Sequence, residues 1–477
     1  MDKHRVRIML VALWAGPFAA AQHAADHWYF GDHAGIDFTS GSAVAVGDGA
    51  LYSWEACTSI SDPATGDLLF YSNGQSVWNA QHQVMPNGSG LMGCDSPQIN
   101  STSQGVLIVP DPGSPSRYYL FTAPCAESGL TDNIKFSVVD MQLDGGLGDV
   151  TVKDSSIYST PSVESLTYTA DAAGTGYWLM GHEWNNNAYV RFQITPSGIS
   201  PPQVQAIGGL LTQVGTTNDG AVCGGAFSPS GTRFAFQSQP WNHVELYRFD
   251  PVTGLLSDVL VLPLDSALHP SDYGHSVSFS PSSCRLYASR VFGPLYQWDL
   301  SSGSDADIVA SRTKLILNLC YGGNMQLAPD GRLYIAQLFG LGLSCIEFPD
   351  ELGAAAGFQL SGLPVIGSSM YGLPQYCSRW FAPPVAQDCA ELPTAVQHAP
   401  RPTPQLLVVP TGAGVDLHLS GLGPIDLRVY DALGRCVWQE RSFSDGMPMR
   451  LVLPSGSYVA VARGPQADLQ RRFLVQR

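Results

Sequence analysis

The chain has 477 residues, of which 44% are hydrophobic and only 13% are charged. With 50 glycines, 34 prolines and 10% aromatic residues, it is rich in turn and strand formers, which argues against an all-helical or a disordered protein. The formal net charge of −16 argues against a nucleic-acid partner or an anionic membrane, since both require clustered Lys and Arg. The charge is uneven: residues 22–400 hold 12 basic and 33 acidic residues, whereas residues 401–477 hold nine Arg and six acidic residues.

The first 21 residues have the pattern of a secretory signal peptide. Basic residues near the start precede an apolar stretch over residues 8–18, and the small residues Ala19 and Ala21 supply a cleavage site before Gln22. This apolar stretch is too short to cross a bilayer core of roughly 30 Å. No other stretch is long and apolar enough to be a transmembrane segment. The sequence therefore predicts an exported, soluble protein.

A turn built from Asp, Ser, Pro and Gly, followed at once by an aromatic strand, recurs six times in the body of the chain. Equivalent points of the six copies are Ile60, Val109, Thr169, Phe227, Phe279 and Leu327. A repeat of about 50 residues with several short strands is typical of β-propeller blades. The span up to Pro383 leaves room for a seventh blade, so seven blades are favoured and six are possible.

The repeat leads to two further expectations. The aromatic segments HWYFG (27–31) and CSRWFAPP (377–384) should pair as strands within one blade and so close the ring of sheets. Four aspartates lie beside Pro or Gly in the turns and are most simply turn formers: Asp62, Asp111, Asp250 and Asp330.

The chain divides into four parts on this interpretation. Residues 1–21 form the signal peptide, residues 22–385 the propeller, and residues 386–405 a proline-rich linker. Residues 406–477 contain seven short strands with Gly or Asp in the turns between them, which predicts a small Ig-like β-sandwich. The predicted fold class is all-β throughout.

Ten cysteines in an exported chain are expected to be paired, at least in part. No two have the C-x-x-C spacing, so a zinc ribbon or thioredoxin-like motif has no support. Cys377 and Cys389 could join the end of the body to the linker, and the other pairings stay open.

Several segments approach known catalytic motifs without completing them. His182-Glu183 begins like a zinc H-E-x-x-H motif, but the fifth position is Asn186. Residues 274–278 (GHSVS) lack the second glycine of a G-x-S-x-G elbow and alternate like a strand. Asp144 and Asp149 flank a glycine-rich loop that could hold a structural Ca²⁺, although a plain turn is favoured. No catalytic, cofactor-binding or metal-binding residue is therefore assigned.

Polar residues beside aromatics in one predicted blade are the candidate ligand contacts: Glu164, His182, Trp184 and Asn186. Exposed aromatic and amide side chains at blade tips would suit a sugar or a protein. Paired carboxylates at a propeller channel could instead cleave glycans, which keeps a glycoside hydrolase or lyase open as the alternative.

The body resembles a group of exported bacterial propeller proteins. The segments that carry the resemblance are WYFGDHAGIDF, ISDPATGDLLFYSNGQSVWN, MPNGSGLMG, VDMQLDGGLGDV, GYWLMGHEWNNNAYV, YGGNMQLAPDGRLYIA and YGLPQYCSRWF. They are spread from residue 28 to residue 381 and so cover nearly the whole body. The resemblance implies an extracellular propeller but names no ligand.

The tail is similar to the type A carboxy-terminal sorting domain of type IX secretion cargo. The residues that carry this similarity are Val429, Tyr430, Asp431, Gly434, Arg435, Gly456 and Tyr458. The similarity implies that an outer-membrane secretion machinery reads the tail, which is then usually removed. The cargo would be released or attached to surface polysaccharide of a Gram-negative bacterium after passing the periplasm. The expected function is thus a secreted or cell-surface binding or structural protein that needs no cofactor.

Overall fold

The computed structural model describes most of two compact units, which divide after residue 392. In the first unit it describes residues 22–94, 101–265, 273–317, 319, 321–383 and 389. In the second it describes residues 405–411, 414–420, 425–433, 435–443, 449–463 and 468–475. The predicted cleavage residues Ala19 and Ala21, the motif residue Gly434 and most of the predicted linker lie outside these ranges.

Seven antiparallel sheets are found among the described residues of the first unit. The first sheet consists of β1 (His27–Phe30), β2 (Ala34–Asp37) and β3 (Val44–Val46), and the second of β4 (Thr58–Ser61), β5 (Leu68–Ser72), β6 (Ser76–Asn79) and β7 (Val84–Ser89). The third consists of β8 (Val106–Pro110), β9 (Arg117–Thr122), β10 (Lys135–Asp140) and β11 (Asp149–Ser156). The fourth consists of β12 (Thr167–Ala170), β13 (Tyr177–His182), β14 (Asn186–Thr195), β15 (Gly198–Ile199) and β16 (Gln203–Leu211). The fifth sheet consists of β17 (Cys223–Phe227), β18 (Arg233–Ser238), β19 (His243–Phe249) and β20 (Leu256–Pro263). The sixth consists of β21 (Gly274–Phe279), β22 (Arg285–Arg290), β23 (Leu295–Asp299) and β24 (Thr313–Ile316). The seventh consists of β25 (Gly322–Leu327), β26 (Leu333–Gln337), β27 (Gly340–Ile346) and β28 (Phe358–Ser369).

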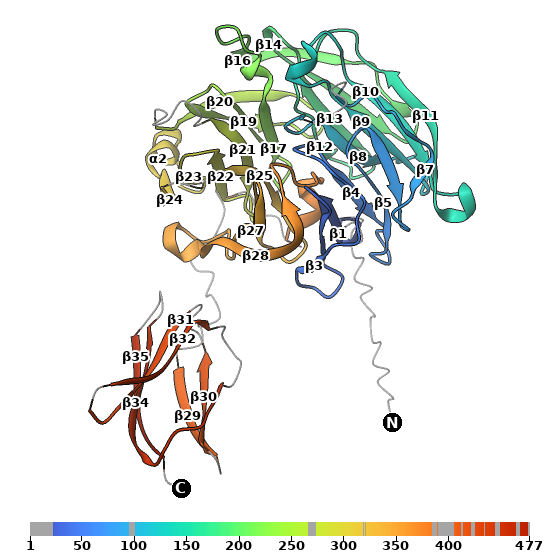
Figure 1. Ribbon diagram of the computed structural model, residues 1–477. Coiled ribbons are helices and arrows are strands. Elements are labelled where there is room, and N and C mark those ends of the chain that lie inside the picture. The colour runs from blue at the N-terminus through green and yellow to red at the C-terminus, as the bar shows by residue number, and fades with distance from the viewer. Residues whose placement is uncertain are drawn as a thin grey trace, which may run out of the picture. The chain divides into compact units, whose positions relative to one another are not determined.

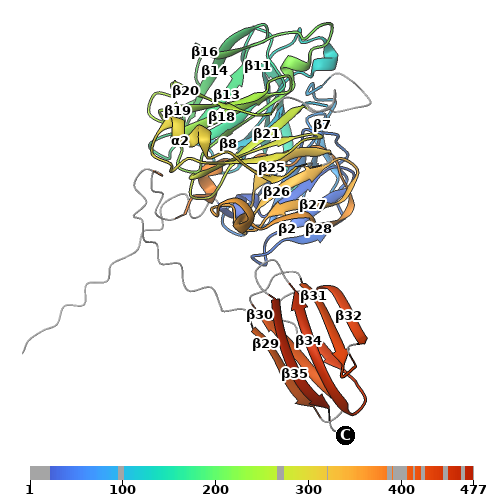
Figure 2. The same ribbon diagram turned by 90° about the vertical axis from the view of Figure 1, so that its left-hand side faces the viewer.

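The sheets follow one another around a common axis, with the first strand of each sheet innermost. β1 contacts β4, β4 contacts β8, and β12, β17, β21 and β25 contact each other in turn. A parallel bridge between Gln104 and Ser165 joins the starts of the third and fourth sheets. The last sheet returns to the first, since β28 lies beside β2 and β3 (Figures 1 and 2). The first unit is therefore a seven-bladed β-propeller, as the repeat spacing favoured.

The predicted turn formers act as predicted. The Oδ1 atoms of Asp62, Asp111, Asp250 and Asp330 accept hydrogen bonds of 2.8, 2.8, 2.9 and 3.1 Å from backbone N–H groups two residues further on. Each carboxylate thereby satisfies donors that a tight turn leaves without a strand partner.

The expected strand pairing between the two ends of the body is wrong. β1 pairs with β2, whereas residues Ser378–Phe381 form a 3₁₀ turn and join no sheet. The ring closes instead through the end of β28. Asp32 N donates to Ser368 O at 2.9 Å, and Ser368 N donates to Asp32 O at 3.1 Å.

Residues 371–381, called here the axial segment, run along the propeller axis after β28. At one end, Tyr371 N donates to Trp54 O, in the loop before β4, at 2.8 Å. At the other end, Arg379 packs against Gly231 in the turn between β17 and β18. The axis is therefore occupied by the chain itself.

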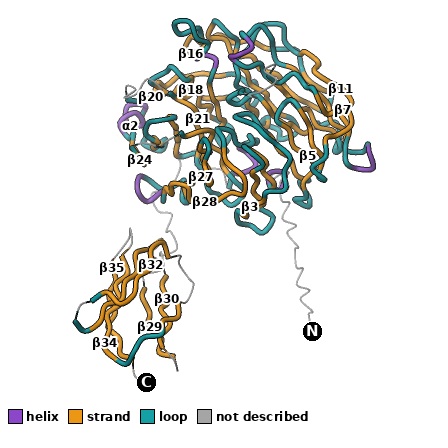
Figure 3. Tube along the Cα trace, in the orientation of Figure 1, coloured by secondary structure: helices purple, strands orange, loops and turns teal. Residues whose placement is uncertain are grey.

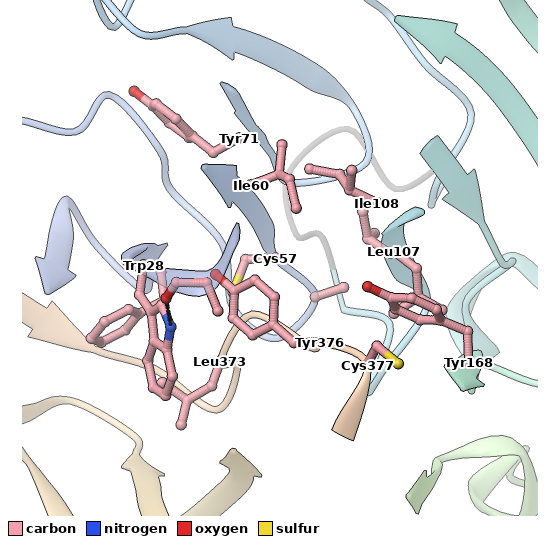
Figure 4. Packing of buried hydrophobic residues seen from close by; sticks show 14 of the residues in the cluster. Trp28, Cys57, Ile60, Tyr71, Leu107, Ile108, Tyr168, Leu373, Tyr376 and Cys377 are labelled. Carbon is pink, nitrogen blue, oxygen red and sulfur yellow. Dashed lines mark hydrogen bonds between the residues drawn. The ribbon is translucent and has the colours of Figure 1, made fainter. Parts of the chain in front are cut away.

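Every blade contributes a contact to the axial segment. The contacting pairs are Trp28–Tyr376, Ser59–Tyr376, Gln104–Gln375, Tyr168–Trp380, Gly231–Arg379, His275–Tyr371 and Gln326–Tyr376. Figure 4 shows Leu373, Tyr376 and Cys377 among side chains of the first blades. Because aromatic side chains bury large apolar areas, this packing is worth about 1.5–3 kcal/mol for each large side chain that it removes from water.

The second unit is a β-sandwich with its own core. Its strands are β29 (Gln405–Thr411), β30 (Gly414–Ser420), β31 (Ile425–Asp431), β32 (Cys436–Phe443), β33 (Met449–Leu451), β34 (Gly456–Arg463) and β35 (Asp468–Val475). One sheet has the order β29-β30-β33 and the other β32-β31-β34-β35. The core between them includes Leu406, Leu417, Leu427, Val429, Ala460 and Val475. The seven strands expected from the sequence are all present.

Helices are few and short in the described chain, as Figure 3 shows. They are α2 (Asp305–Ala310) and 3₁₀ turns at Gln22–Ala25, Ala126–Ser128, Asp144–Gly146, Asp219–Ala221, Gly353–Ala356 and Ser378–Phe381. Among the described residues, no helix is long and apolar enough to cross a membrane.

Candidate functional site

The innermost strands all begin at the same end of the propeller, called here the axial face. The loops that enter the first strands and the loops between second and third strands lie at this face. The loop before β4 carries Glu55, and the loop before β12 carries Glu164. Two carboxyl groups from different blades thus lie at one end of the axis.

Both carboxyl groups are buried, and each is hydrogen-bonded. Glu164 is 1% exposed, and its two oxygens accept from Ser103 N at 2.9 Å and Ala126 N at 2.5 Å. Glu55 is 9% exposed, and its Oε2 accepts from Ser101 Oγ at 3.1 Å. Burial raises the pKa of Glu55 to about 7, against a smaller lowering effect of the Ser101 hydrogen bond.

The charge of Glu55 also affects Glu164. Burial, followed by the nearby Glu55 carboxylate, raises the pKa of Glu164 well above its ordinary value. Two such groups cannot both ionise at low cost, so at neutral pH the pair retains a proton. Glu164 is fixed by two backbone donors, which leaves Glu55 as the more accessible acid.

The axial segment lies directly beside this pair. A Cβ atom on Gly372 would lie 1.3 Å from Glu55 O, so only glycine allows the segment to pass so close to the Glu55 backbone. The Tyr371 ring packs against the His275 ring at a tilt of 39°, with ring centroids 5.3 Å apart. His275 is 3% exposed, and burial lowers its pKa to about 4, so its imidazole is neutral at neutral pH.

Four aromatic residues lie in loops of the second, sixth and seventh blades at the axial face and are called here the aromatic rim: Trp54, Phe292, Tyr321 and Phe339. The rings of Trp54 and Phe339 meet edge-on at 5.5 Å, and those of Phe292 and Tyr321 at 4.6 Å. Leu338 N donates to Tyr321 O at 3.1 Å, which joins the loops that carry Tyr321 and Phe339.

Two rim residues are exposed and have unusual backbones. Phe339 is 61% exposed and Tyr321 is 44% exposed, although both rings are large and apolar. Their φ angles are +55° and +60°, in the left-handed region that non-glycine residues rarely adopt. Ten other described non-glycine residues share this conformation, so the exposure of the two rings is what distinguishes them.

The other predicted ligand contacts lie inside the fourth blade. His182 is buried beside Tyr189 and Phe236, and burial lowers its pKa to about 4. Trp184 is 8% exposed and belongs to the same apolar cluster. Asn186 donates to Glu183, which also accepts from Tyr158. The structure brings Glu164 to the axial face but uses His182 and Trp184 for packing.

The near-catalytic motifs take part in local structure. Residues 274–279 form β21, and Ser276 Oγ accepts from Met325 N of the next blade at 3.0 Å. In the glycine-rich loop, Asp144 is exposed, and Asp149 Oδ1 accepts from Asn87 Nδ2 at 3.0 Å.

One disulfide is formed among the described cysteines, between Cys94 and Cys125. The suggested link between Cys377 and Cys389 is wrong: the two are not joined, and Cys389 Sγ instead shares the acceptor Ser282 O with Cys284 Sγ.

In the second unit, most of the motif residues gather on one sheet. Asp431 pairs with Tyr458 and Tyr430 with Val459 across β31 and β34. Val429 lies in the core, and Gly456 begins β34.

These strands also form a hollow on the surface of the second unit. Tyr430, Asp431 and Tyr458 line this hollow of about 760 Å³, together with residues of β35. Arg435 Nε donates to Asp431 Oδ2 at 2.8 Å and closes the turn after β31.

No family model matches the chain, and no curated protein matches it. Solved structures resemble it at low sequence identity. A proposed 6-phosphogluconolactonase from Bacteroides fragilis is 13% identical, with 73% of this chain and 97% of that one covered and a TM-score of 0.46. The Cps50 (Swd1) β-propeller domain from Myceliophteria thermophila is 12% identical, with 79% and 97% covered and a TM-score of 0.32.

Sqt1 from Chaetomium thermophilum is 14% identical, with 68% of this chain and 79% of that one covered and a TM-score of 0.37. These likenesses concern the fold alone. The propeller assignment rests on the sheet order of the chain itself.

The sequence patterns did not indicate Glu55 or the aromatic rim as candidate site residues. Glu55 follows Trp54 in a segment without a strand pattern, and only the ring of blades brings it near Glu164. Tyr321 opens the segment YGGN directly before a first strand, as Glu164 opens ESLTY. A search of the three residues before each first strand would have found Glu55 and Tyr321, whereas Phe292 and Phe339 lie between second and third strands.

Proposed function

We propose that this chain is a cargo of the type IX secretion system that acts outside the cell as a non-catalytic binding protein. In this proposal the propeller binds the ligand, and the β-sandwich tail is the sorting signal. The export half of this proposal rests on the clustering of the motif residues around one hollow of the tail. The signal-peptide pattern and the Cys94–Cys125 disulfide support passage through an oxidising compartment.

A secretion receptor needs a surface that it can read on a tail that folds separately. Val429 supplies core packing, whereas Tyr430, Asp431 and Arg435 are at least partly accessible. The Asp431–Arg435 pair fixes the turn beside the hollow. The motif therefore divides into residues that maintain the sandwich and residues that present a surface.

The export half is tested in a bacterium that has type IX machinery, with a reporter protein that carries residues 1–21 at its N-terminus and residues 401–477 at its C-terminus. The reporter should reach the cell surface or medium, and Asp431→Ala or Arg435→Ala should reduce its export. Leu433→Ala is the matched control, since Leu433 lies in the same turn, is 77% exposed and is outside the motif. A reporter that stays in the periplasm contradicts the proposal. The intact mass of the exported full chain then tells whether the tail is removed.

The aromatic rim carries the binding half. Exposed aromatic rings on a rigid scaffold, beside polar groups, suit either the faces of sugar rings or a protein partner. We favour an extracellular glycan, because the exposed rings of the rim can stack on the faces of sugar rings and share the axial face with the Glu55 carboxyl group. The measurement is binding of the full chain to a panel of extracellular polysaccharides.

Tyr321→Ala and Phe339→Ala should each weaken binding about tenfold or more, as expected for anchors worth more than about 1.4 kcal/mol. Phe348→Ala is the matched control, since Phe348 is 53% exposed and lies in the loop between β27 and β28, at the opposite end of the blade. Equal loss in all three variants would contradict a site at the rim.

The second candidate function is a glycan-cleaving enzyme, which the Glu55–Glu164 pair favours. A carboxyl group whose pKa lies near 7 is a suitable general acid. If this candidate holds, the full chain cleaves polysaccharides, and Glu55→Gln removes cleavage while it preserves binding. Binding without product formation supports the non-catalytic function instead.

A further inference from the structure

We propose that Cys284 and Cys389 form a second disulfide, which fastens the chain to the propeller just after it leaves the axis. Cys284 ends the turn between β21 and β22, at the face opposite the axial face. Cys389 comes after the axial segment and precedes the second unit. In the structure both residues are thiols, and the proposed disulfide is their oxidised state.

The two thiols occupy one site. Cys284 Sγ lies 3.4 Å and Cys389 Sγ lies 3.9 Å from the same acceptor, Ser282 O. The two side chains also hydrogen-bond each other. Cys284 is 2% exposed and Cys389 is 4% exposed, so the pair is enclosed by the fold. Two cysteines from segments far apart in sequence are therefore already side by side.

The electrostatics of Cys284 differ from those of other described cysteines. The hydrogen bond with Cys389 lowers the pKa of the Cys284 thiol to about 7, against the opposing effect of burial. Burial raises the pKa of Cys345 and of Cys377 to about 11. Thiolates are the nucleophiles of disulfide formation, so Cys284 is the reactive member of the pair.

Oxidation of the two thiols requires an oxidant that contains a disulfide and accepts two electrons. The Cys284 thiolate attacks a sulfur of the oxidant's disulfide and forms a mixed disulfide, and one thiolate of the oxidant leaves. The Cys389 thiolate then attacks Cys284 Sγ and displaces the second. Two electrons pass to the oxidant, which becomes a dithiol with the two protons of the cysteines.

This link would secure the part of the fold that closes the ring. The axial segment touches every blade but is covalently continuous only with β28. A disulfide after it closes a loop of about 100 residues and opposes withdrawal of the segment from the axis. If the tail is removed after export, the link also holds the new end of the propeller chain in place.

The inference depends on the proposed export only for its natural oxidant, and the test supplies oxidised glutathione instead. The reduced full chain is folded in a glutathione redox buffer, its remaining thiols are alkylated after denaturation, and its peptides are mapped by mass spectrometry. We expect the Cys284 and Cys389 peptides as one linked species. Alkylation of both residues in protein that has formed Cys94–Cys125 overturns the inference.

A stability measurement supports the mapping. Cys389→Ala should lower the Tm by several degrees without reductant, and the difference from the wild-type chain should disappear in dithiothreitol. Cys345→Ala is the control, because its effect should be the same in both conditions. A double Cys284→Ala/Cys389→Ala variant should lose no more of the reductant-sensitive stability than either single variant.

Discussion

The phenol oxygen of Tyr376 lies 2.7 Å from Ser59 Oγ, although 317 residues separate the two positions. The same phenol donates to His27 O at 3.1 Å. One side chain of the axial segment thus holds the first strands of the first two blades. This contact joins the two ends of the propeller chain without any strand pairing between them.

Tyr376→Phe should lower the free energy of unfolding by about 1–2 kcal/mol, because it removes a buried hydrogen-bonding group but retains the ring. Ser59 still donates to His27 O at 2.6 Å, which limits the loss. Equilibrium urea unfolding measures the change. No change in the midpoint would mean that the phenol does not fasten the two ends.

Gly372→Ala should destabilise the propeller by about 3 kcal/mol or more, since the added Cβ meets the Glu55 backbone and not a side chain that can move. Gly303→Ala is the matched control. Gly303 has a φ of +88° and no atom near its missing Cβ, so this change should cost only about 1 kcal/mol. Thermal unfolding of both variants measures the two losses of stability. Similar losses for the two variants would argue against a close passage of the chain at Gly372.

Glu55→Gln should stabilise the folded chain above pH 7 and have little effect at pH 4. The folded-state pKa of Glu55 is raised to about 7, above its ordinary value near 4.5. Between these values the unfolded chain loses a proton that the folded chain keeps, so stability falls as the pH rises.

The shift corresponds to at most about 3 kcal/mol at high pH. Tm measured from pH 4 to pH 8 gives the slope, and Asp144→Asn, at an exposed aspartate between β10 and β11, is the control. Parallel curves for Glu55→Gln and wild type would show that Glu55 titrates normally.

Removal of the axial segment should open the propeller. A chain ending at Pro383 keeps every contact of residues 371–381, whereas a chain ending at Ser369 loses all of them. We expect the first to be monomeric with cooperative unfolding, and the second to aggregate or to melt at a much lower temperature. Both chains lack Cys389 and therefore leave Cys284 without its proposed disulfide partner, so the comparison is made in reductant. Equal behaviour would show that the ring of sheets is stable without its axial segment.

The turn chemistry made much of this fold predictable. Four aspartates are local signals, since each carboxylate binds donors two residues away: Asp62, Asp111, Asp250 and Asp330. The recurrence of these turns indicated the blade repeat. In the tail, the alternation of apolar and polar residues and the turns between them indicated the seven strands. The site was less predictable, because its residues meet only through the ring. Glu164 was found among local polar residues, whereas Glu55 belongs to a blade two places earlier and has no local pattern that marks it.

The sequence by itself determined the all-β class, the repeated blades, the seven strands of the tail and the acidic character of the body. These depend on short-range patterns: torsions set by Pro and Gly, and alternation between buried and exposed faces. Only the tertiary structure decided the path of residues 371–381. An aromatic segment satisfies the same local rules as a strand or as an axial filler. Its place was decided by Gly372 passing Glu55 and by Tyr376 reaching Ser59, which are contacts between positions about 320 residues apart.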